Sequence, residues 1–301
     1  MRGRGTDLIQ AGPESALLGH HLGGRGNDAL SGLASPLSGR LESHGPSISF
    51  VDLTVQLLHD RMISGLYSPV ALRRRCPLGG SMPVTIHEQS EQLKAAAAER
   101  LPSEVVDVFD RSIQDLLDQG VPAGAVKVGD TLESFTLTDA TNALVTLDQL
   151  VESGPAVIVF YRGGWCPYCN LALRTYQHGL VPELAGFSAR LVAISPQSPD
   201  QSLSTAEKAE LDFTVLSDPG NRVARSVGIV FQQAEEVLEA QRKLGLDLAQ
   251  VNAEGSTQLP RPTVLIVDKD RTVRFVDVQP DYTARTEVAD ILAGLTELDT
   301  N

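Results

Sequence analysis

Residues 157–170 read VIVFYRGGWCPYCN and contain two of the three cysteines of the chain. Four apolar residues lead to an aromatic residue, a pair of glycines, and then Cys166 and Cys169, three positions apart. The apolar run 156–160 has the length of a buried central strand, and Pro167 suits the first position of a helix. Cys166 is therefore the predicted N-cap of a helix that starts at Pro167, and Cys169 falls in its first turn.

The cysteine pair could bind a metal, form a structural disulfide, lie inert in the core or perform redox chemistry. A zinc site needs four ligands, but Cys76 lies far upstream and His178 is the only histidine after His87, so no metal is expected. A disulfide that closes so short a loop would add only roughly 2 kcal/mol. Free N–H groups at a helix start lower a thiol pKa from about 8.5 to roughly 3.5–7.5, and Arg162 adds a positive charge. Redox chemistry is the favoured interpretation.

Composition limits the class of protein. The chain has 301 residues, of which 42% are hydrophobic and 21% charged, as in an ordinary soluble protein of one or two domains. A net charge of -13 argues against a nucleic-acid partner, because phosphate binding draws on surplus Lys and Arg. No apolar run is long enough to span a membrane. Three cysteines are too few for the disulfide framework that is typical of small secreted proteins. A cytoplasmic location is therefore expected.

Residues 1–81 differ in composition from the rest. They hold 13 of the 26 glycines and no lysine, and eight Arg against six Asp and Glu give a charge of +2. Such sequence buries too little apolar surface to offset its ordering entropy. We expect these residues to form a disordered extension. The alternative is a basic regulatory arm. A chain that starts at Met82 should keep its fold and activity, and Cys76 should be dispensable.

Residues 82–123 are predicted to be a helical segment. Residues 85–100 are rich in helix formers, and a second helix should start with Ser103 as N-cap and end at Gly120. Its apolar stripe consists of Val105, Val106, Phe109, Ile113, Leu116 and Leu117. This stripe needs a partner, either the following domain or the second subunit of a homodimer.

Residues 124–301 alternate between strand and helix patterns. A hairpin is predicted for S-F-T-L-T and A-L-V-T-L, followed by a helical turn at 147–151 and the strand 156–160. The later expected elements are helix 167–184, strand 190–195, helix 200–211, strand 213–216, helices 217–227 and 232–246, strands 263–267 and 271–278, and helix 286–295. This order predicts an α/β fold whose sheet is covered on both faces.

Five segments carry a resemblance to a known family. They are KVGDTLESFTLTD, FYRGGWCPYCN, LVAISPQSPD, FTVLSDPGNRVARSVG and PTVLIVDKD, in that order between Lys127 and Leu295. GWCPYC at a strand-to-helix junction resembles thioredoxin-fold active sites. The whole series is similar to the peroxiredoxins of the alkyl hydroperoxide reductase/thiol-specific antioxidant group, in the subgroup of bacterioferritin comigratory protein. The resemblance implies a thioredoxin-like fold, a central mixed sheet flanked by helices.

The CxxC departs from the peroxiredoxin pattern. Arg162 stands in place of the family's proline, Cys166 in place of its threonine, and Cys169 where the peroxide-attacking cysteine is expected. The resemblance therefore implies that Cys169 attacks the peroxide and Cys166 resolves the product. Helix geometry alone favours Cys166 as the attacking residue, because the N-cap side chain is the more exposed.

The resemblance also implies further site residues. Arg261 lies near the position of a second family arginine that supports the thiolate. Pro262 is similar to the cis proline that thioredoxin-fold proteins hold opposite their cysteines, although a simple strand-entry proline would explain it equally. Tyr161, Gly164, Trp165 and Pro262 are the expected residues of the substrate pocket.

The implied activity is that of a thiol peroxidase without metal or organic cofactor. It would reduce hydrogen peroxide or an organic hydroperoxide and be recycled by a thioredoxin-like reductant. One alternative is a thiol–disulfide oxidoreductase that acts on protein disulfides. Another is a non-enzymatic redox sensor or a carrier of a soft metal ion.

Overall fold

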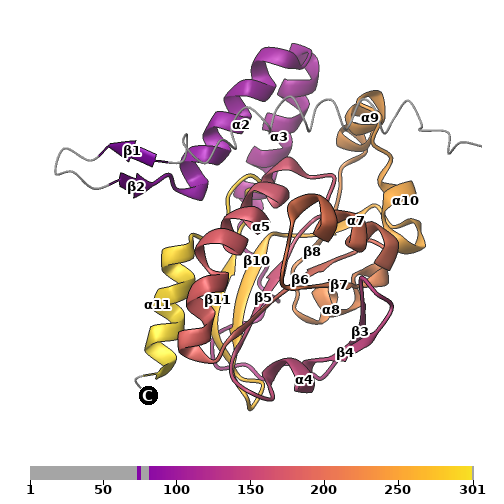
Figure 1. Ribbon diagram of the computed structural model, residues 1–301. Coiled ribbons are helices and arrows are strands. Elements are labelled where there is room, and N and C mark those ends of the chain that lie inside the picture. Colours follow the sequence, from indigo (N-terminus) through magenta and orange to yellow (C-terminus); the bar gives the residue numbers. More distant parts are fainter. Residues whose placement is uncertain (1–72, 76–80, 300–301) are drawn as a thin grey trace, which may run out of the picture. The chain divides into compact units, whose positions relative to one another are not determined.

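The computed structural model describes residues 73–75 and 81–299, which include a seven-stranded mixed sheet (Figure 1). The strand order is β11-β10-β5-β6-β7-β3-β4. The strands are β3 (Thr136–Asp139), β4 (Leu144–Thr146), β5 (Ala156–Phe160), β6 (Arg190–Ser195), β7 (Thr214–Ser217), β10 (Thr263–Val267) and β11 (Val273–Val278). β5, β6 and β7 are parallel, and the other pairs are antiparallel. β5, which leads into the CxxC, is thus a central strand, as predicted.

Helices cover both faces of this sheet, which confirms the predicted α/β thioredoxin-like fold. They are α2 (Ile86–Arg100), α3 (Ser103–Gln119), α4 (Leu147–Val151), α5 (Pro167–Gly179), α6 (Val181–Leu184), α7 (Pro199–Ala209), α8 (Arg222–Ser226), α9 (Glu235–Lys243), α10 (Leu248–Val251) and α11 (Val288–Asp299). α5 and α11 lie side by side on one face (Figure 1). α4 and α8 pack on the other.

Successive residues of β5 divide between two cores. Val157 and Val159 face the core that contains α5, α11 and the apolar residues of α2. Ala156, Ile158 and Phe160 face the core below α4 and α8. All five residues are at most 5% exposed, and this explains why the strand reads as a continuous apolar run rather than an alternating one.

Defined residues cap the helical segment before the sheet at both of its ends. Thr85 caps α2 in a reciprocal capping box with Glu88. The carboxylate of Glu287 also accepts hydrogen bonds from the backbone N–H groups of Ile86 (3.0 Å) and His87 (2.8 Å). At the other end Gly120, with φ of 64°, terminates α3 as predicted.

Two details of α3 were predicted wrongly. Ser103 is the first helical residue, and Pro102 takes the N-cap position without a side-chain hydrogen bond. Leu117 is 45% exposed and lies outside the buried stripe, because it sits at the edge of the helix face that packs.

Three predicted helices are shorter than expected. The helix predicted over 217–227 is reduced to a 3₁₀ turn at Pro219–Asn221 and to α8, because Ser217 ends β7 and Gly220 and Asn221 have positive φ angles. The helix predicted over 167–184 ends at Gly179 and restarts as α6, because Pro182 has no N–H to continue the hydrogen-bond ladder. The helix predicted over 232–246 is limited to α9. Gln232, the first residue of the predicted helix, instead ends β8 (Val230–Gln232), which pairs antiparallel with β9 (Gln258–Pro260) in a separate two-stranded sheet. That pairing joins residues almost 30 positions apart, and local patterns do not reveal it.

A short hairpin crosses the predicted boundary of the extension. β1 (Arg73–Arg75) pairs antiparallel with β2 (Ser81–Pro83). The rest of the extension, including Cys76, lies outside the described residues, so its disorder stays a prediction.

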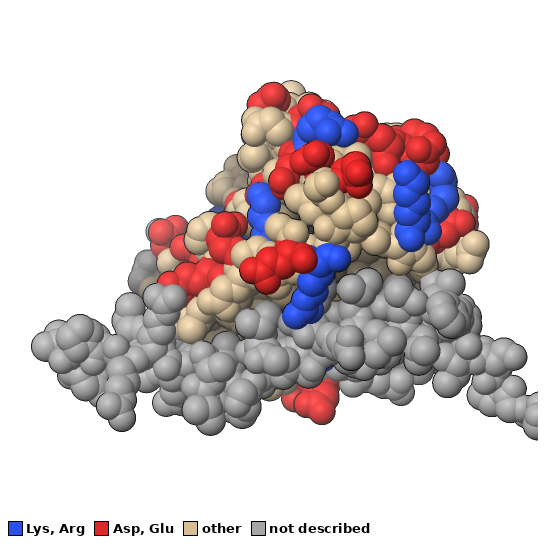
Figure 2. All heavy atoms as spheres, turned by 90° about the horizontal axis from the view of Figure 1, so that it is seen from above, with Lys and Arg blue, Asp and Glu red and all other residues tan. Residues whose placement is uncertain are grey.

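The face of the described part that is shown in Figure 2 is rich in acidic side chains. In the view of Figure 2, Asp and Glu side chains spread over the described atoms, with Lys and Arg scattered among them. None of the described helices combines the length and the apolar character needed to cross a membrane. On this face, the described residues form no continuous patch of Lys and Arg.

Candidate active site

The loop between β5 and α5 makes a tight turn that only glycine fits. Gly163 has φ of 141°, and a Cβ there would lie 2.5 Å from Trp165 Nε1. A Cβ on Gly164 would lie 2.1 Å from Thr205 Oγ1. The N–H of Gly164 donates to Gln197 Oε1 at 2.7 Å, so the turn is fixed to the loop after β6. Gly164, which was predicted as a pocket residue, therefore acts in the structure through the backbone geometry of the turn.

The turn delivers both cysteines to the start of α5. Cys166 is the N-cap and Pro167 the first helical residue, which confirms the predicted local structure. The carbonyl of Cys166 accepts the backbone N–H of Cys169 at 3.1 Å. Both cysteines are free thiols, and each is only 1% exposed.

An arginine that the sequence did not single out lies against the sulfurs. Arg285 Nη2 donates to Cys169 Sγ at 3.1 Å and lies 3.9 Å from Cys166 Sγ. Its Nη1 donates to the carbonyls of Tyr282 and Ala284, so the guanidinium is held by its own loop. The Tyr176 hydroxyl of α5 donates to the carbonyl of Thr286 at 2.7 Å and ties this loop to the cysteine helix.

The two sulfurs have opposite protonation tendencies. Burial opposes ionisation of Cys169, but the hydrogen bond from Cys166 and the charges of Arg285 and Arg162 outweigh it and hold the pKa of Cys169 well below its usual value. Burial raises the pKa of Cys166 well above its usual value, and the hydrogen bond to Cys169 and the negative charge there act in the same direction. The pair therefore stabilises one thiolate, on Cys169, beside one thiol.

Arg162 lies beside the cysteine pair, as predicted, and is 3% exposed. Its guanidinium stacks over the rings of Tyr282, at 4.2 Å, and Trp165, at 4.9 Å. Its Nη2 donates to Gln233 Oε1 at 3.3 Å. The charge of Arg162 lowers the pKa of both cysteines.

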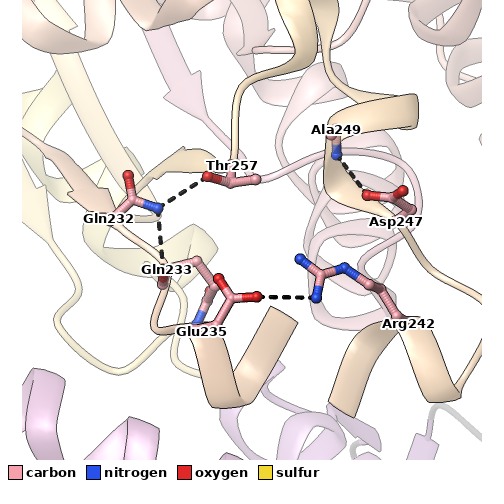
Figure 3. A network of polar contacts seen from close by, with 7 residues as sticks. All are labelled: Gln232, Gln233, Glu235, Arg242, Asp247, Ala249 and Thr257. Atoms are coloured by element: carbon pink, nitrogen blue, oxygen red, sulfur yellow. Dashed lines mark hydrogen bonds and ion pairs between the residues drawn. The ribbon is translucent and has the colours of Figure 1, made fainter. Parts of the chain in front are cut away.

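Gln233, the partner of Arg162, lies at the start of the α9 region shown in Figure 3. Gln232 Nε2 donates to the carbonyl of Gln233 at 3.2 Å and to Thr257 Oγ1 at 3.0 Å. Within α9, Glu235 and Arg242 form an ion pair of 3.0 Å. These contacts hold the segment that carries the acceptor for Arg162.

Arg261 does not take the position that was predicted for it. Its guanidinium donates to Gln119 Oε1 at 3.3 Å and lies 5.5 Å from the ring of Phe231. Among the described residues it makes no hydrogen bond to either sulfur. Its side chain extends toward the end of α3, whereas the next residue, Pro262, lines the cavity beside Cys169. Arg285 is the arginine that reaches the thiolate.

A small inner cavity lies beside Cys169. Its volume is about 10 Å³, roughly that of one water molecule. Tyr161, Pro262 and Arg285 contribute to its lining, so two predicted pocket residues are present there. Burial raises the pKa of Tyr161 to about 12, and its hydroxyl is buried without a hydrogen bond of normal geometry. At neutral pH this hydroxyl is therefore uncharged, and Tyr161 lines the same cavity as Cys169.

Cys166 faces a different and larger cavity, of about 250 Å³. Trp165 and Arg162 line it, together with residues of α2, α3 and α9. The first turn of α5 thus places one sulfur at each cavity.

Comparison with known proteins identifies the family. Residues 128–276 match the sequence model of the AhpC/TSA family. A protein of Mycobacterium tuberculosis (strain H37Rv), whose name places it among the peroxiredoxins, is 32% identical over 104 residues, which are 35% of this chain and 67% of the relative. This chain belongs to the peroxiredoxin family. It is a thiol peroxidase of the thioredoxin-fold superfamily, an oxidoreductase, as the resemblance implied.

Two further relatives carry peroxiredoxin names, and one solved structure is similar in part. The bcp protein of Haemophilus influenzae, also named as a peroxiredoxin, is 32% identical over 107 residues, 35% of this chain and 66% of the relative. Peroxiredoxin Q of Sedum lineare, named as chloroplastic, is 31% identical over 104 residues. These residues are 35% of this chain and 55% of the relative. The crystal structure of the peroxidoxin BcpB of Mycobacterium tuberculosis matches with a TM-score of 0.46 and 27% sequence identity. The match covers 57% of this chain and 98% of the BcpB chain.

Several residues around the cysteines lie outside the family match. Arg285 and Tyr282 follow its end at residue 276, and α2 and α3 precede its start at residue 128. The lone arginine in DYTARTE has no local signal that separates it from a surface residue. Only the tertiary contact at 3.1 Å reveals Arg285 as part of the site.

Proposed function

We propose that the chain reduces hydroperoxides with Cys169 as the attacking thiolate, Cys166 as the resolving thiol and Arg285 as the cation that stabilises the thiolate. The observation that carries this proposal is the 3.1 Å contact between Arg285 Nη2 and Cys169 Sγ. It favours the charged, nucleophilic form of the sulfur.

In the first step the Cys169 thiolate attacks the terminal oxygen of the hydroperoxide. A sulfur–oxygen bond forms, the oxygen–oxygen bond breaks, and the alkoxide or hydroxide leaves and takes up a proton. Cys169 is then a sulfenic acid, oxidised by two electrons, and the peroxide has been reduced by two. Arg285 and Arg162 stabilise the negative charge that moves from sulfur to the leaving oxygen.

In the second step the Cys166 sulfur attacks the sulfenic sulfur of Cys169. A disulfide forms and water leaves. Residues three apart on a helix are neighbours, so this disulfide closes within the first turn of α5. An external dithiol of the thioredoxin class then reduces the disulfide by exchange and is itself oxidised.

One observation favours a second function, that of a thiol–disulfide oxidoreductase acting on proteins. Cys166, and not Cys169, lines the larger cavity. A bulky disulfide would therefore meet Cys166 first, and Cys166 would be the attacking residue.

The two functions are separated by parallel assays on the reduced protein. Peroxide consumption coupled to thioredoxin, thioredoxin reductase and NADPH, with the Cys166→Ser/Cys169→Ser variant as blank, supports the peroxidase. Reduction of insulin disulfides without peroxide turnover would support the oxidoreductase instead. Stoichiometric binding of Cu(I) with neither activity would overturn both in favour of a metal carrier.

A further inference from the structure

One buried side chain next to Cys169 holds the glycine turn against the helix. Asn170 follows Cys169 in α5 and is 5% exposed. Its Nδ2 donates to the carbonyl of Gly164 at 2.7 Å, and its backbone N–H donates to the carbonyl of Cys166 at 3.1 Å. Asn170 therefore fastens the loop that carries Cys166 at two points to the helix that carries Cys169.

A second buried amide holds Gly164 as well. Gln197 is 2% exposed, and its Oε1 accepts the N–H of Gly164 at 2.7 Å. The backbone of Gln197 is itself fixed, because it forms an isolated β-bridge with Asn252. Each backbone polar group of Gly164 thus has a side-chain amide as its partner. Losing such a partner away from water is costly, so the two hydrogen bonds favour one position of the loop.

Cys166 is the cysteine of the pair that has room to move. As the N-cap it has φ of -89° and ψ of 116°, outside the helical region, whereas Cys169 is held within α5. Cys166 also lines the cavity of about 250 Å³. If the loop were released, the Cys166 sulfur would be free to turn into this space and away from Cys169.

Closure of the disulfide requires Cys166 and Cys169 to approach each other. Residues three apart on a helix have Cβ atoms about 5–6 Å apart, whereas a disulfide needs roughly 3.5–4.5 Å. Both sulfurs already lie near one nitrogen, since Arg285 Nη2 is 3.1 Å from Cys169 Sγ and 3.9 Å from Cys166 Sγ. The remaining approach of roughly 1–2 Å depends on where the loop holds Cys166.

We propose that Asn170 is a positioning residue for the resolving step, because it keeps Cys166 beside the oxidised sulfur of Cys169. This role rests on the proposed function and adds the residue that governs resolution. If closure is slow, a second hydroperoxide transfers its terminal oxygen to the sulfenic sulfur and leaves as water or an alcohol. Cys169 is then a sulfinic acid, oxidised by two further electrons, which thiols do not reduce.

Gln177 offers a matched control on the same helix. It lies about two turns after Asn170 and is 8% exposed. Its Nε2 donates to Asp212 Oδ2 at 2.7 Å, and its Oε1 accepts the N–H of Asp212 at 2.9 Å. Gln177→Ala therefore removes hydrogen bonds of a similarly buried amide without touching the cysteine loop.

The two chemical steps can be followed separately in the reduced full-length protein. It is mixed with hydrogen peroxide, quenched in acid at set times and alkylated, and the state of each cysteine is measured by peptide mass spectrometry. Loss of the Cys169 thiol gives the rate of attack. Formation of the disulfide between Cys166 and Cys169 gives the rate of closure, and excess peroxide gives the ratio of sulfinic acid to disulfide.

Asn170→Ala should attack peroxide at the wild-type rate but close the disulfide about fivefold to tenfold more slowly, because one positioning hydrogen bond is lost. The ratio of sulfinic acid to disulfide should rise by a similar factor. Gln177→Ala should leave both rates and the ratio unchanged. Gln197→Ala removes the other hold on Gly164 and should also slow closure, so the test remains available if Asn170→Ala does not fold. Stability of each variant is measured by urea unfolding.

The outcomes separate this role from the proposed function. Slower closure with unchanged attack in Asn170→Ala, but not in Gln177→Ala, supports the positioning role. Closure at the wild-type rate in Asn170→Ala would overturn it. Equal slowing of attack and closure, or equal effects in Asn170→Ala and Gln177→Ala, would show a merely structural residue and overturn it too. A Cys169 thiol that does not react with peroxide in the wild type would overturn the proposed function itself.

Discussion

Arg285 Nη2 donates to Cys169 Sγ at 3.1 Å, although the two residues are 116 positions apart in the sequence. The interaction is mutual: burial disfavours the charge of Arg285, but the negative charge of the cysteine pair, placed mainly at Cys169, more than compensates and raises the pKa of Arg285. A buried cation and a buried thiolate therefore stabilise each other.

Replacing Arg285 by Gln should raise the pKa of Cys169 toward its usual value. Because the thiolate is the reactive form and exists above the pKa, reaction with peroxide at pH 7 should slow by about tenfold or more and recover as pH rises. The measurement is the second-order rate of peroxide reduction between pH 5 and 9. Arg274→Gln, a surface arginine paired with Asp268, is the matched control. An unchanged pH profile in Arg285→Gln would refute the role of this contact.

The two cysteines should respond differently to one equivalent of peroxide. Cys166→Ser should accumulate sulfenic acid on Cys169, because the thiolate remains beside Arg285 but the resolving thiol is gone. Cys169→Ser should react far more slowly, since the pKa of the remaining Cys166 is raised by burial. Sulfenic acid is trapped and located by mass spectrometry. Trapping mainly on Cys166 would reverse the assignment and favour the oxidoreductase.

Gly164→Ala should disturb the cysteine turn. The new Cβ would meet Thr205 Oγ1 at 2.1 Å, so the turn or the middle of α7 must move. We expect a loss of roughly 1–3 kcal/mol in the free energy of unfolding, measured in urea, and slower peroxide reduction. Thr205→Ala removes the nearest atom, and the double variant should recover part of the loss. Equal stability of Gly164→Ala and wild type would show that the close approach is not structural.

Glu287 should hold α2 against the loop that carries Arg285. Glu287→Ala removes the acceptor of two backbone N–H groups at the start of the helix, which should lower the free energy of unfolding by roughly 1–3 kcal/mol. It should also speed tryptic cleavage after Arg100. Glu99→Ala, an exposed acidic residue of the same helix, serves for comparison. If the two variants were cleaved at the same rate, Glu287 would not be the anchor.

Local features of the cysteine loop were predictable from the sequence. The strand 156–160, the glycine turn, the N-cap at Cys166 and the helix start at Pro167 all depend on residues within about fifteen positions of one another. Backbone preferences and short-range hydrogen bonds determine such elements. The strand 263–267 was predictable for the same reason, because an unbroken apolar run of that length suits a strand buried on both faces.

The surroundings of the sulfurs were decided only by the tertiary structure. Arg261 has the sequence position expected of the supporting arginine, yet its side chain extends toward Gln119, and Arg285 from a later loop reaches Cys169. The cavity beside Cys166 likewise joins α2 and α3 to α9, which begins more than a hundred residues after α3 ends. Residue types and local periodicity determine which elements form. Which side chains meet at one sulfur depends on how the packed elements direct them, and that direction is set by long-range contacts absent from any short stretch of sequence.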